Sequence, residues 1–140
     1  MSGERFVLDA SVAIEWFLPG SGPQVRYAES VLERIGSEGL LPTVPDLWHY
    51  EVGSVLIAAT RARQISATKL RAAKLAIRGL HLDSMVLEID AVALMELSQR
   101  YHLQGYDTVY FELARRLEIP IASIDGGIKE ACRTFKVQLL

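Results

Sequence analysis

Short, wholly apolar runs alternate with longer segments of helical periodicity along the chain, and no other feature of the sequence constrains its fold as strongly. The apolar runs predict strands at residues 6–8, 41–44, 85–87, 121–124 and 137–140. The periodic segments predict helices at residues 12–17, 23–38, 47–63, 67–78, 91–101, 106–117 and 126–134. Strands that are apolar throughout are buried on both faces, and parallel strands need helical crossovers. The sequence therefore predicts an α/β fold, a three-layer α/β/α sandwich with a central parallel sheet of four to five strands.

Capping residues support the expected helix starts. A serine or aspartate just before a helix can accept hydrogen bonds from the free backbone N–H groups of the first turn. Such residues precede four of the expected helices: Ser11, Asp46, Ser66 and Asp90. We therefore expect side-chain caps at these positions.

The composition is that of one folded domain. The chain has 140 residues, 50% of them hydrophobic, and domains of roughly 100–150 residues bury a single core. We therefore expect one domain over residues 1–140. The one cysteine, Cys132, has no partner for an internal disulfide, which is typical of the reducing cytoplasm. A cytoplasmic location is the expectation.

The sequence also lacks the features expected of a membrane protein or of a chain with a signal peptide. The first five residues lack the basic start and apolar run of a signal peptide, and no segment approaches the ~18 consecutive apolar residues of a membrane helix. The net charge is −2, so any polyanion would have to meet a local basic patch. We expect no membrane association.

Two aspartates stand at the ends of expected strands. Asp9 follows the first strand, and Asp125 follows the strand at 121–124. In open parallel sheets, ligands bind outside the carboxyl ends of the strands, where the strand order reverses. Taken alone, the two aspartates are equally well explained as helix caps.

Two further acids occupy helical positions that are expensive for a charge. Helical spacing places Glu51 in an apolar stripe that we expect to contain Tyr50, Val55 and Ala58. Asp107 lies at the start of its helix on the same face as Tyr110, where a carboxylate would lose hydration. The helix dipole offsets part of that cost for Asp107.

Four carboxylates that converge on one cleft would repel one another and raise each other's pKa unless a cation neutralised them. Clustered oxygen ligands without a convergent His or Cys suit Mg2+ or Mn2+. Such an ion polarises a phosphoryl oxygen and lowers the pKa of a bound water toward about 7, which provides a nucleophile for phosphodiester hydrolysis. Ser11 and Thr108 stand beside two of the acids, and we expect them as helix caps or as supports that orient ligands or waters.

Four segments carry these acids in order along the chain: FVLDAS at 6–11, PDLWHYEV at 45–52, GYDT at 105–108 and IASID at 121–125. In order, spacing and context they resemble the motifs of PIN-domain ribonucleases. Within that family they are most similar to the VapC-type toxins of prokaryotic toxin–antitoxin pairs. The resemblance covers nearly the whole chain.

The resemblance implies a PIN-like α/β/α sandwich and a Mg2+- or Mn2+-dependent endoribonuclease with an RNA substrate. Carried across residue by residue, it makes Asp9, Glu51, Asp107 and Asp125 the catalytic and metal-binding acids, with Asp9 and Asp107 as the principal ligands. It also implies a homodimer and a cognate antitoxin that covers the cleft. Gly126-Gly127 stands where some members carry further acidic or polar residues, so the number of metal ions stays open.

A basic strip is a candidate surface for the RNA. Its members lie at the end of one expected helix and at helical spacing on the next: Arg61, Arg63, Arg71, Lys74 and Arg78. A solvated helix face explains the strip as well as RNA binding does.

Two other classes of α/β domain with acids at strand ends do not fit the sequence. A receiver domain needs paired acids after its first strand, and a haloacid-dehalogenase-type phosphatase needs a second aspartate where this chain has Ser11. The alternative that stays open is a non-catalytic PIN-like domain that binds RNA or protein, since a fold can persist when its chemistry is lost.

Overall fold

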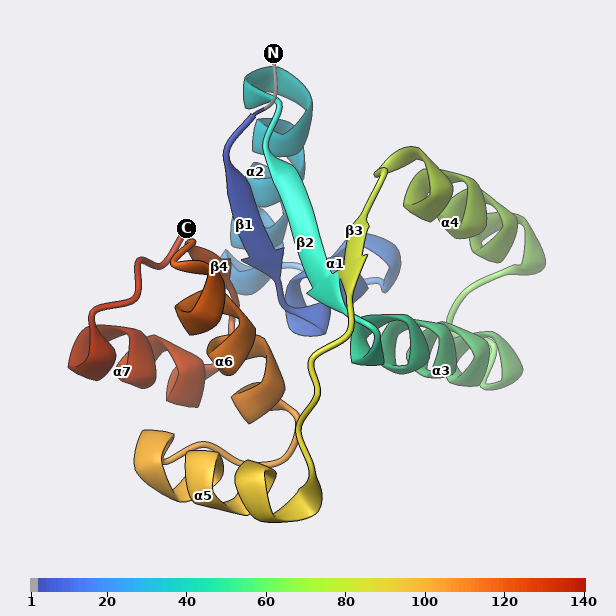
Figure 1. Ribbon diagram of the computed structural model, residues 1–140. Helices are drawn as coiled ribbons and strands as arrows, with labels where there is room; N and C mark the ends of the chain where they lie inside the picture. The colour runs from blue at the N-terminus through green and yellow to red at the C-terminus, as the bar shows by residue number, and fades with distance from the viewer. Residues whose placement is uncertain (1–2) are drawn as a thin grey trace.

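The computed structural model describes residues 3–140, and the first two residues of the expected domain lie outside that range. The described chain contains four strands: β1 (Arg5–Leu8), β2 (Leu41–Pro45), β3 (Asp83–Met85) and β4 (Ile121–Ala122). It also contains seven helices: α1 (Ala10–Phe17), α2 (Pro23–Glu38), α3 (Leu47–Arg61), α4 (Ala67–Gly79), α5 (Ala91–Tyr101), α6 (Asp107–Leu117) and α7 (Gly126–Phe135). The strands and helices follow one another along the chain as in Figure 1.

All four strands form one parallel sheet in the order β3-β2-β1-β4. Val7 of β1 is the central register position, because it pairs with Thr43 of β2 on one side and with Ile121 of β4 on the other. From β1 the chain first builds the sheet toward β3 and later returns to add β4 on the opposite side. The strand order therefore reverses at β1, and ligands of such sheets bind outside the carboxyl ends at the point of reversal.

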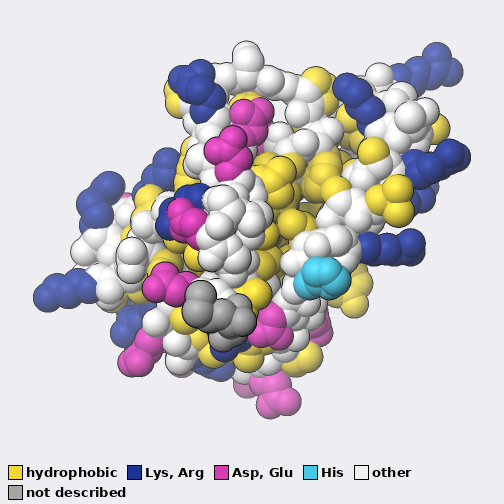
Figure 2. Space-filling model, turned by 90° about the horizontal axis from the view of Figure 1, so that it is seen from above, with side chains coloured by type: hydrophobic (Ala, Val, Ile, Leu, Met, Phe, Trp, Pro, Cys, Tyr) yellow, Lys and Arg dark blue, Asp and Glu magenta, His cyan; other side chains and the backbone are white. Residues whose placement is uncertain are grey.

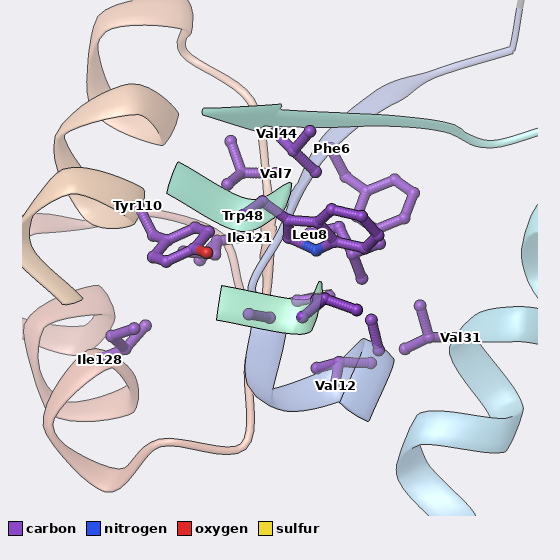
Figure 3. Close-up of a cluster of buried hydrophobic side chains, with 14 of the residues drawn as sticks. Phe6, Val7, Leu8, Val12, Val31, Val44, Trp48, Tyr110, Ile121 and Ile128 are labelled. Carbon is purple, nitrogen blue, oxygen red and sulfur yellow. The ribbon is translucent and has the colours of Figure 1, made fainter. Parts of the chain in front are cut away.

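Successive side chains of β1 point to opposite faces of the sheet, so the strand contributes to the core on both faces (Figure 3). Phe6 and Leu8 point to the side of Trp48 and α1, whereas Val7 points to the side of Tyr110 on α6. All five side chains are buried. This two-sided burial is what a parallel sheet between helical layers requires, and the predicted fold class is confirmed.

The α3–α4 hairpin lies at the β3 side of the sheet, whereas α6 and α7 lie at the β4 side (Figure 1). Helix α4 buries one side chain, Ala73. In the part of the chain from residue 3 to residue 140, no helix combines the length and apolar composition that a membrane crossing needs.

Two strand predictions were wrong. The third strand is Asp83–Met85 rather than 85–87, and Val86 is 72% exposed. Arg5 pairs with Asp83 at 2.7 Å and His49 lies 2.6 Å from Ser84, so polar side chains line this edge strand and an apolar criterion misses it. At the C-terminus, the predicted strand 137–140 is a single parallel bridge between residue 139 and residue 121. The sheet of the described chain therefore has four strands.

Of the four capping predictions, two are confirmed and two are wrong. Ser66 and Asp90 accept hydrogen bonds from first-turn N–H groups at 3.1 and 2.8 Å, as expected. Ser11 is not a cap, because Asp9 occupies that position and α1 begins before Ser11. Asp46 has helical dihedral angles and makes no side-chain cap hydrogen bond, so its carboxylate does not serve the helix start.

Candidate active site

The four predicted acids reach the carboxyl edge of the sheet from four different elements. Asp9 directly follows β1 and caps α1, and Asp125 follows β4 and caps α7 by accepting from the backbone N–H of Ile128 at 2.9 Å. Glu51 lies in the second turn of α3, which leaves β2, and Asp107 is the first residue of α6. The cap interpretation is thus correct for both strand-end aspartates and is compatible with a shared site.

The charges of Asp125, Asp9 and Glu51 all act on Asp107. Burial is the largest cause that raises the pKa of the Asp107 carboxyl to about 6, and the negative charges of these three acids raise it further. The Asp107 side chain accepts no hydrogen bond from any residue of the described range. The structure therefore brings the other three predicted acids within electrostatic reach of Asp107.

Asp9 is the most deeply buried of the four, with 4% of its surface exposed. Its carboxylate accepts from the Ser11 backbone N–H at 3.4 Å, from the Ser11 hydroxyl at 2.8 Å and from the Ser123 hydroxyl at 2.7 Å. Burial raises the pKa of Asp9 most, the serine hydrogen bonds lower it, and the Asp125 charge raises it. Ser11 thus supports the acid, which was its second predicted role.

Ser123 is a site residue that the sequence reasoning missed. Its side chain is fully buried, and its hydroxyl donates to Asp9 while accepting from the backbone N–H of Asp125 at 3.0 Å. The available signal was a single polar residue inside the apolar run at 121–124. Ser123 joins the ends of β1 and β4 across the point where the strand order reverses.

Glu51 is held by Tyr110, which the sequence placed only as an apolar neighbour of Asp107. The phenol donates to Oε1 of Glu51 at 2.6 Å. Burial raises the pKa of Glu51, the Tyr110 hydrogen bond lowers it, and the charge of Asp9 raises it.

The predicted apolar stripe around Glu51 was wrong. Tyr50 is 73% exposed, and Ala58 is also exposed. The buried face of α3 consists instead of Trp48, Val52, Leu56 and Ala59. Glu51 lies beside that face at intermediate exposure, so its position costs less desolvation than a central one would.

Thr108 lies next to Asp107 in sequence but its hydroxyl turns to another helix. The residue is fully buried, and its Oγ1 lies 2.8 Å from Oγ of Ser98 on α5. This hydrogen bond connects α5 to α6. The structure thus places the Thr108 hydroxyl against Ser98 rather than against a carboxylate.

A polar pocket adjoins the two acids that are nearest the β4 side. Its volume is about 260 Å3, and it is lined by His102, Leu103, Gln104, Asp107, Asp125 and Gly127. A Cβ atom on Gly127 would lie 3.1 Å from Oδ2 of Asp125 and 3.4 Å from Cδ2 of Leu103. Gly127 therefore leaves room for the Asp125 carboxylate at this wall.

The charge and donor types of the acid cluster fit a hard divalent cation. The ion pairs of the described residues join Arg5 to Asp83, and basic residues to Glu38, Glu112 and Glu130, and none includes a member of the cluster. Carboxylate oxygens are the ligands that Mg2+ and Mn2+ prefer. As the side chains stand, however, residues 3–140 contain no group of three or more His, Cys, Asp or Glu arranged to hold a metal. A bound ion would require the carboxylates to turn toward it.

The predicted basic strip lies on the other side of the sheet from α7. Its members are all exposed on or next to α3 and α4, at the β3 side in Figure 1: Arg61, Arg63, Arg71, Lys74 and Arg78. None of them forms an ion pair within the described range. Figure 2 shows dark-blue side chains on both flanks of the molecule, so basic residues in that view are not confined to one side. RNA binding by this strip stays a prediction.

Comparison with known proteins identifies the fold. No family model and no curated protein matches the sequence. Among solved structures, the chain is similar to the crystal structure of PAE2754 from Pyrobaculum aerophilum, a PIN-domain protein, with a TM-score of 0.61 and 17% identity. The match covers 94% of this chain and 86% of that chain. The chain therefore has an α/β fold that resembles a PIN-domain structure.

Proposed function

We propose that this protein is a metal-dependent endoribonuclease that hydrolyses RNA phosphodiester bonds. The observation that carries the proposal is the convergence of four carboxylates, without a basic partner in the described residues, at the reversal point of a PIN-like sheet. Such mutual repulsion is a cost for the folded protein. Perturbed carboxyl pKa values at a sheet edge are typical of functional sites.

Asp9 and Asp107 are the principal ligands of Mg2+ or Mn2+ in this proposal, and Glu51 and Asp125 complete the set. When bound, the cation neutralises phosphate charge and lowers the pKa of a water. The protein's own part is to hold the ligands. The Ser11 and Ser123 hydroxyls orient Asp9, and the cap at the start of α7 orients Asp125.

A toxin role with a cognate antitoxin, a homodimer and a cytoplasmic location belong to the same proposal. Their support is the resemblance of the four acid-bearing segments to VapC-type toxins. Cys132 is a free, buried thiol, which fits a reducing compartment. Induced expression of the chain alone should arrest bacterial growth, whereas the Asp107→Asn variant should not; equal growth arrest by both would contradict a toxin that acts through this site.

A non-catalytic RNA- or protein-binding domain is the second candidate. The observation that favours it is that, within residues 3–140, no three His, Cys, Asp or Glu side chains are arranged so that they could bind one metal ion. A PIN-like domain that has lost its chemistry would still present the same sheet and basic surface.

Cleavage of a mixed RNA pool separates the two candidates. The purified protein should shorten RNA with Mg2+ or Mn2+ and not with EDTA. Asp107→Asn should abolish cleavage. Asp107 is a better target than Asp9, because the Asp9 carboxylate accepts hydrogen bonds from Ser11 and Ser123 that a substitution would disturb. The Asp107 carboxylate accepts none from the described residues. Asp46→Asn, an exposed acid just after β2, is the matched control and should cleave normally.

Either of two results would overturn the nuclease. Cleavage that persists in EDTA and in Asp107→Asn would come from another enzyme. RNA that shifts in a gel without becoming shorter, with either metal, would establish the binding domain instead.

A further inference from the structure

The phenol of Tyr110 and the carboxylate of Glu51 form a hydrogen bond between α6, which precedes β4, and α3, which follows β2. Tyr110 is 1% exposed, and its hydroxyl lies 2.6 Å from Oε1 of Glu51. Tyr110 lies three positions after Asp107 in α6, so both lie on one face of that helix. One helix therefore supplies a carboxylate of the cluster and a donor to a second carboxylate.

Glu51 needs such a donor more than the other three acids do. Asp9 and Asp125 are short side chains that also serve as helix caps, and Asp107 is anchored by its short side chain at a helix start. Glu51 has one more rotatable bond and lies at the edge of the buried face of α3. Repulsion from the neighbouring carboxylates would turn it outward to solvent. The rigid phenol, locked in the core, opposes that movement.

We propose that Tyr110 is the positioning residue of Glu51, holding Oε1 so that the other carboxylate oxygen is directed into the acid cluster. The inference rests on the proposed metal-dependent function and adds to it a residue that does not touch the ion. Partners that orient metal ligands typically change metal affinity or activity by about 10–100-fold when they are removed.

The chain contains a matched control for this interaction. Tyr101 on α5 donates to Oε1 of Glu112 on α6, also at 2.6 Å. The Tyr101 ring packs edge-on against Phe111 and Phe135, and Glu112 also pairs with Arg116. This second tyrosine–glutamate pair includes no member of the acid cluster. Loss of its hydroxyl removes the same chemical group from a buried site without altering Glu51.

The test compares Tyr110→Phe with Tyr101→Phe. Mn2+ binding is measured by calorimetry on each RNA-free protein, with thermal unfolding alongside. Tyr110→Phe should bind Mn2+ about 10–100-fold more weakly, whereas Tyr101→Phe should bind it like the parent although both lose a buried hydrogen bond. In RNA cleavage, Tyr110→Phe should lower kcat and leave KM for RNA unchanged. The double variant Tyr110→Phe/Glu51→Gln should bind Mn2+ no more weakly than Glu51→Gln, because Tyr110 acts through Glu51.

The outcomes separate the inference from the function on which it rests. If the parent binds Mn2+ and cleaves RNA but Tyr110→Phe is its equal, positioning by Tyr110 is wrong and the nuclease stands. Positioning by Tyr110 would also be wrong if Tyr101→Phe lost as much Mn2+ affinity as Tyr110→Phe. It would be wrong as well if the losses of Mn2+ affinity from Tyr110→Phe and Glu51→Gln added together in the double variant. If the parent neither binds Mn2+ nor cleaves, the proposed function fails and the inference fails with it. Should Tyr110→Phe not fold, Glu51→Asp withdraws the carboxylate from the phenol by one methylene and carries the same expectation.

Discussion

The hydroxyl of Ser123 lies 2.7 Å from Oδ2 of Asp9, and these two residues are 114 positions apart in the chain. The same hydroxyl accepts the backbone N–H of Asp125, so its own proton is available for Asp9. One buried side chain thus connects two of the four acids and the ends of two adjacent strands. The acid cluster and the sheet are built as one unit at this edge.

Ser123→Ala should destabilise the protein. It removes a hydrogen bond to a buried carboxylate and leaves the Asp125 N–H without its partner, a loss of about 1–3 kcal/mol. Urea unfolding measures the change. Ser30→Ala, which removes an exposed hydroxyl from α2, should change the free energy of unfolding by less than about 0.5 kcal/mol; equal effects of the two variants would show that the Ser123 contacts contribute nothing.

Asp107 should make the metal-free protein less stable as the pH rises. Its pKa is raised from 3.8 to about 6 in the folded protein, so between these values the folded state binds more protons than the unfolded state. The contribution of protonated Asp107 is complete below about pH 4 and is lost as the pH rises through about 6. Asp107→Asn should be more stable than the parent at pH 7 by about 1 kcal/mol, a figure reduced for the partial exposure of the carboxyl.

Unfolding in EDTA at a series of pH values tests this dependence on Asp107. The difference between parent and Asp107→Asn should widen from pH 4 to pH 7, because the other acids titrate in both proteins. A constant difference across this range would mean that the Asp107 carboxyl is not perturbed.

Two adjacent glycines should respond differently to alanine. A Cβ at Gly126 meets no atom within 4 Å, whereas a Cβ at Gly127 lies 3.1 Å from Oδ2 of Asp125. Gly126→Ala should stabilise α7 by about 0.4–1 kcal/mol. Gly127→Ala should lack that gain and should weaken Mn2+ binding, because the Asp125 carboxylate must move. Thermal unfolding and Mn2+ calorimetry on both variants check the pair, and identical behaviour would show that the Gly127 wall is not restrictive.

The basic strip should contribute to RNA affinity through phosphate contacts. Replacing Arg71 and Lys74 by alanine should weaken the binding of single-stranded RNA and reduce the slope of log affinity against log salt by about 0.7 for each lost contact. Fluorescence anisotropy with the inactive Asp107→Asn protein measures both quantities. Arg26→Ala/Lys136→Ala removes the same charge from other exposed positions. If this control variant loses as much affinity, the strip has no special role and is a solvated helix face.

The helices were predictable because their signals are local. The apolar spacing over residues 23–38 corresponds to α2 without a change of boundary, and α5 begins after the predicted cap Asp90 and ends at Tyr101. The polar edge strand β3 was misplaced, since it is defined by its parallel pairing with β2, and its side chains meet Arg5 and His49 on other elements rather than an apolar core. The last predicted strand is a single bridge because Leu139 meets only residue 121 of β4.

The sequence by itself determined the α/β class and predicted the parallel sheet and the four acids, because periodicity and strand ends can be seen within a few residues and the acid-bearing segments resemble known motifs. Only the tertiary structure decided which polar groups hold those acids. Tyr110 is 59 residues from Glu51 and Ser123 is 114 residues from Asp9, and such pairs depend on strand order and helix packing rather than on local pattern. A buried phenol or hydroxyl looks like an ordinary core residue until the fold places a carboxylate within hydrogen-bond distance of it.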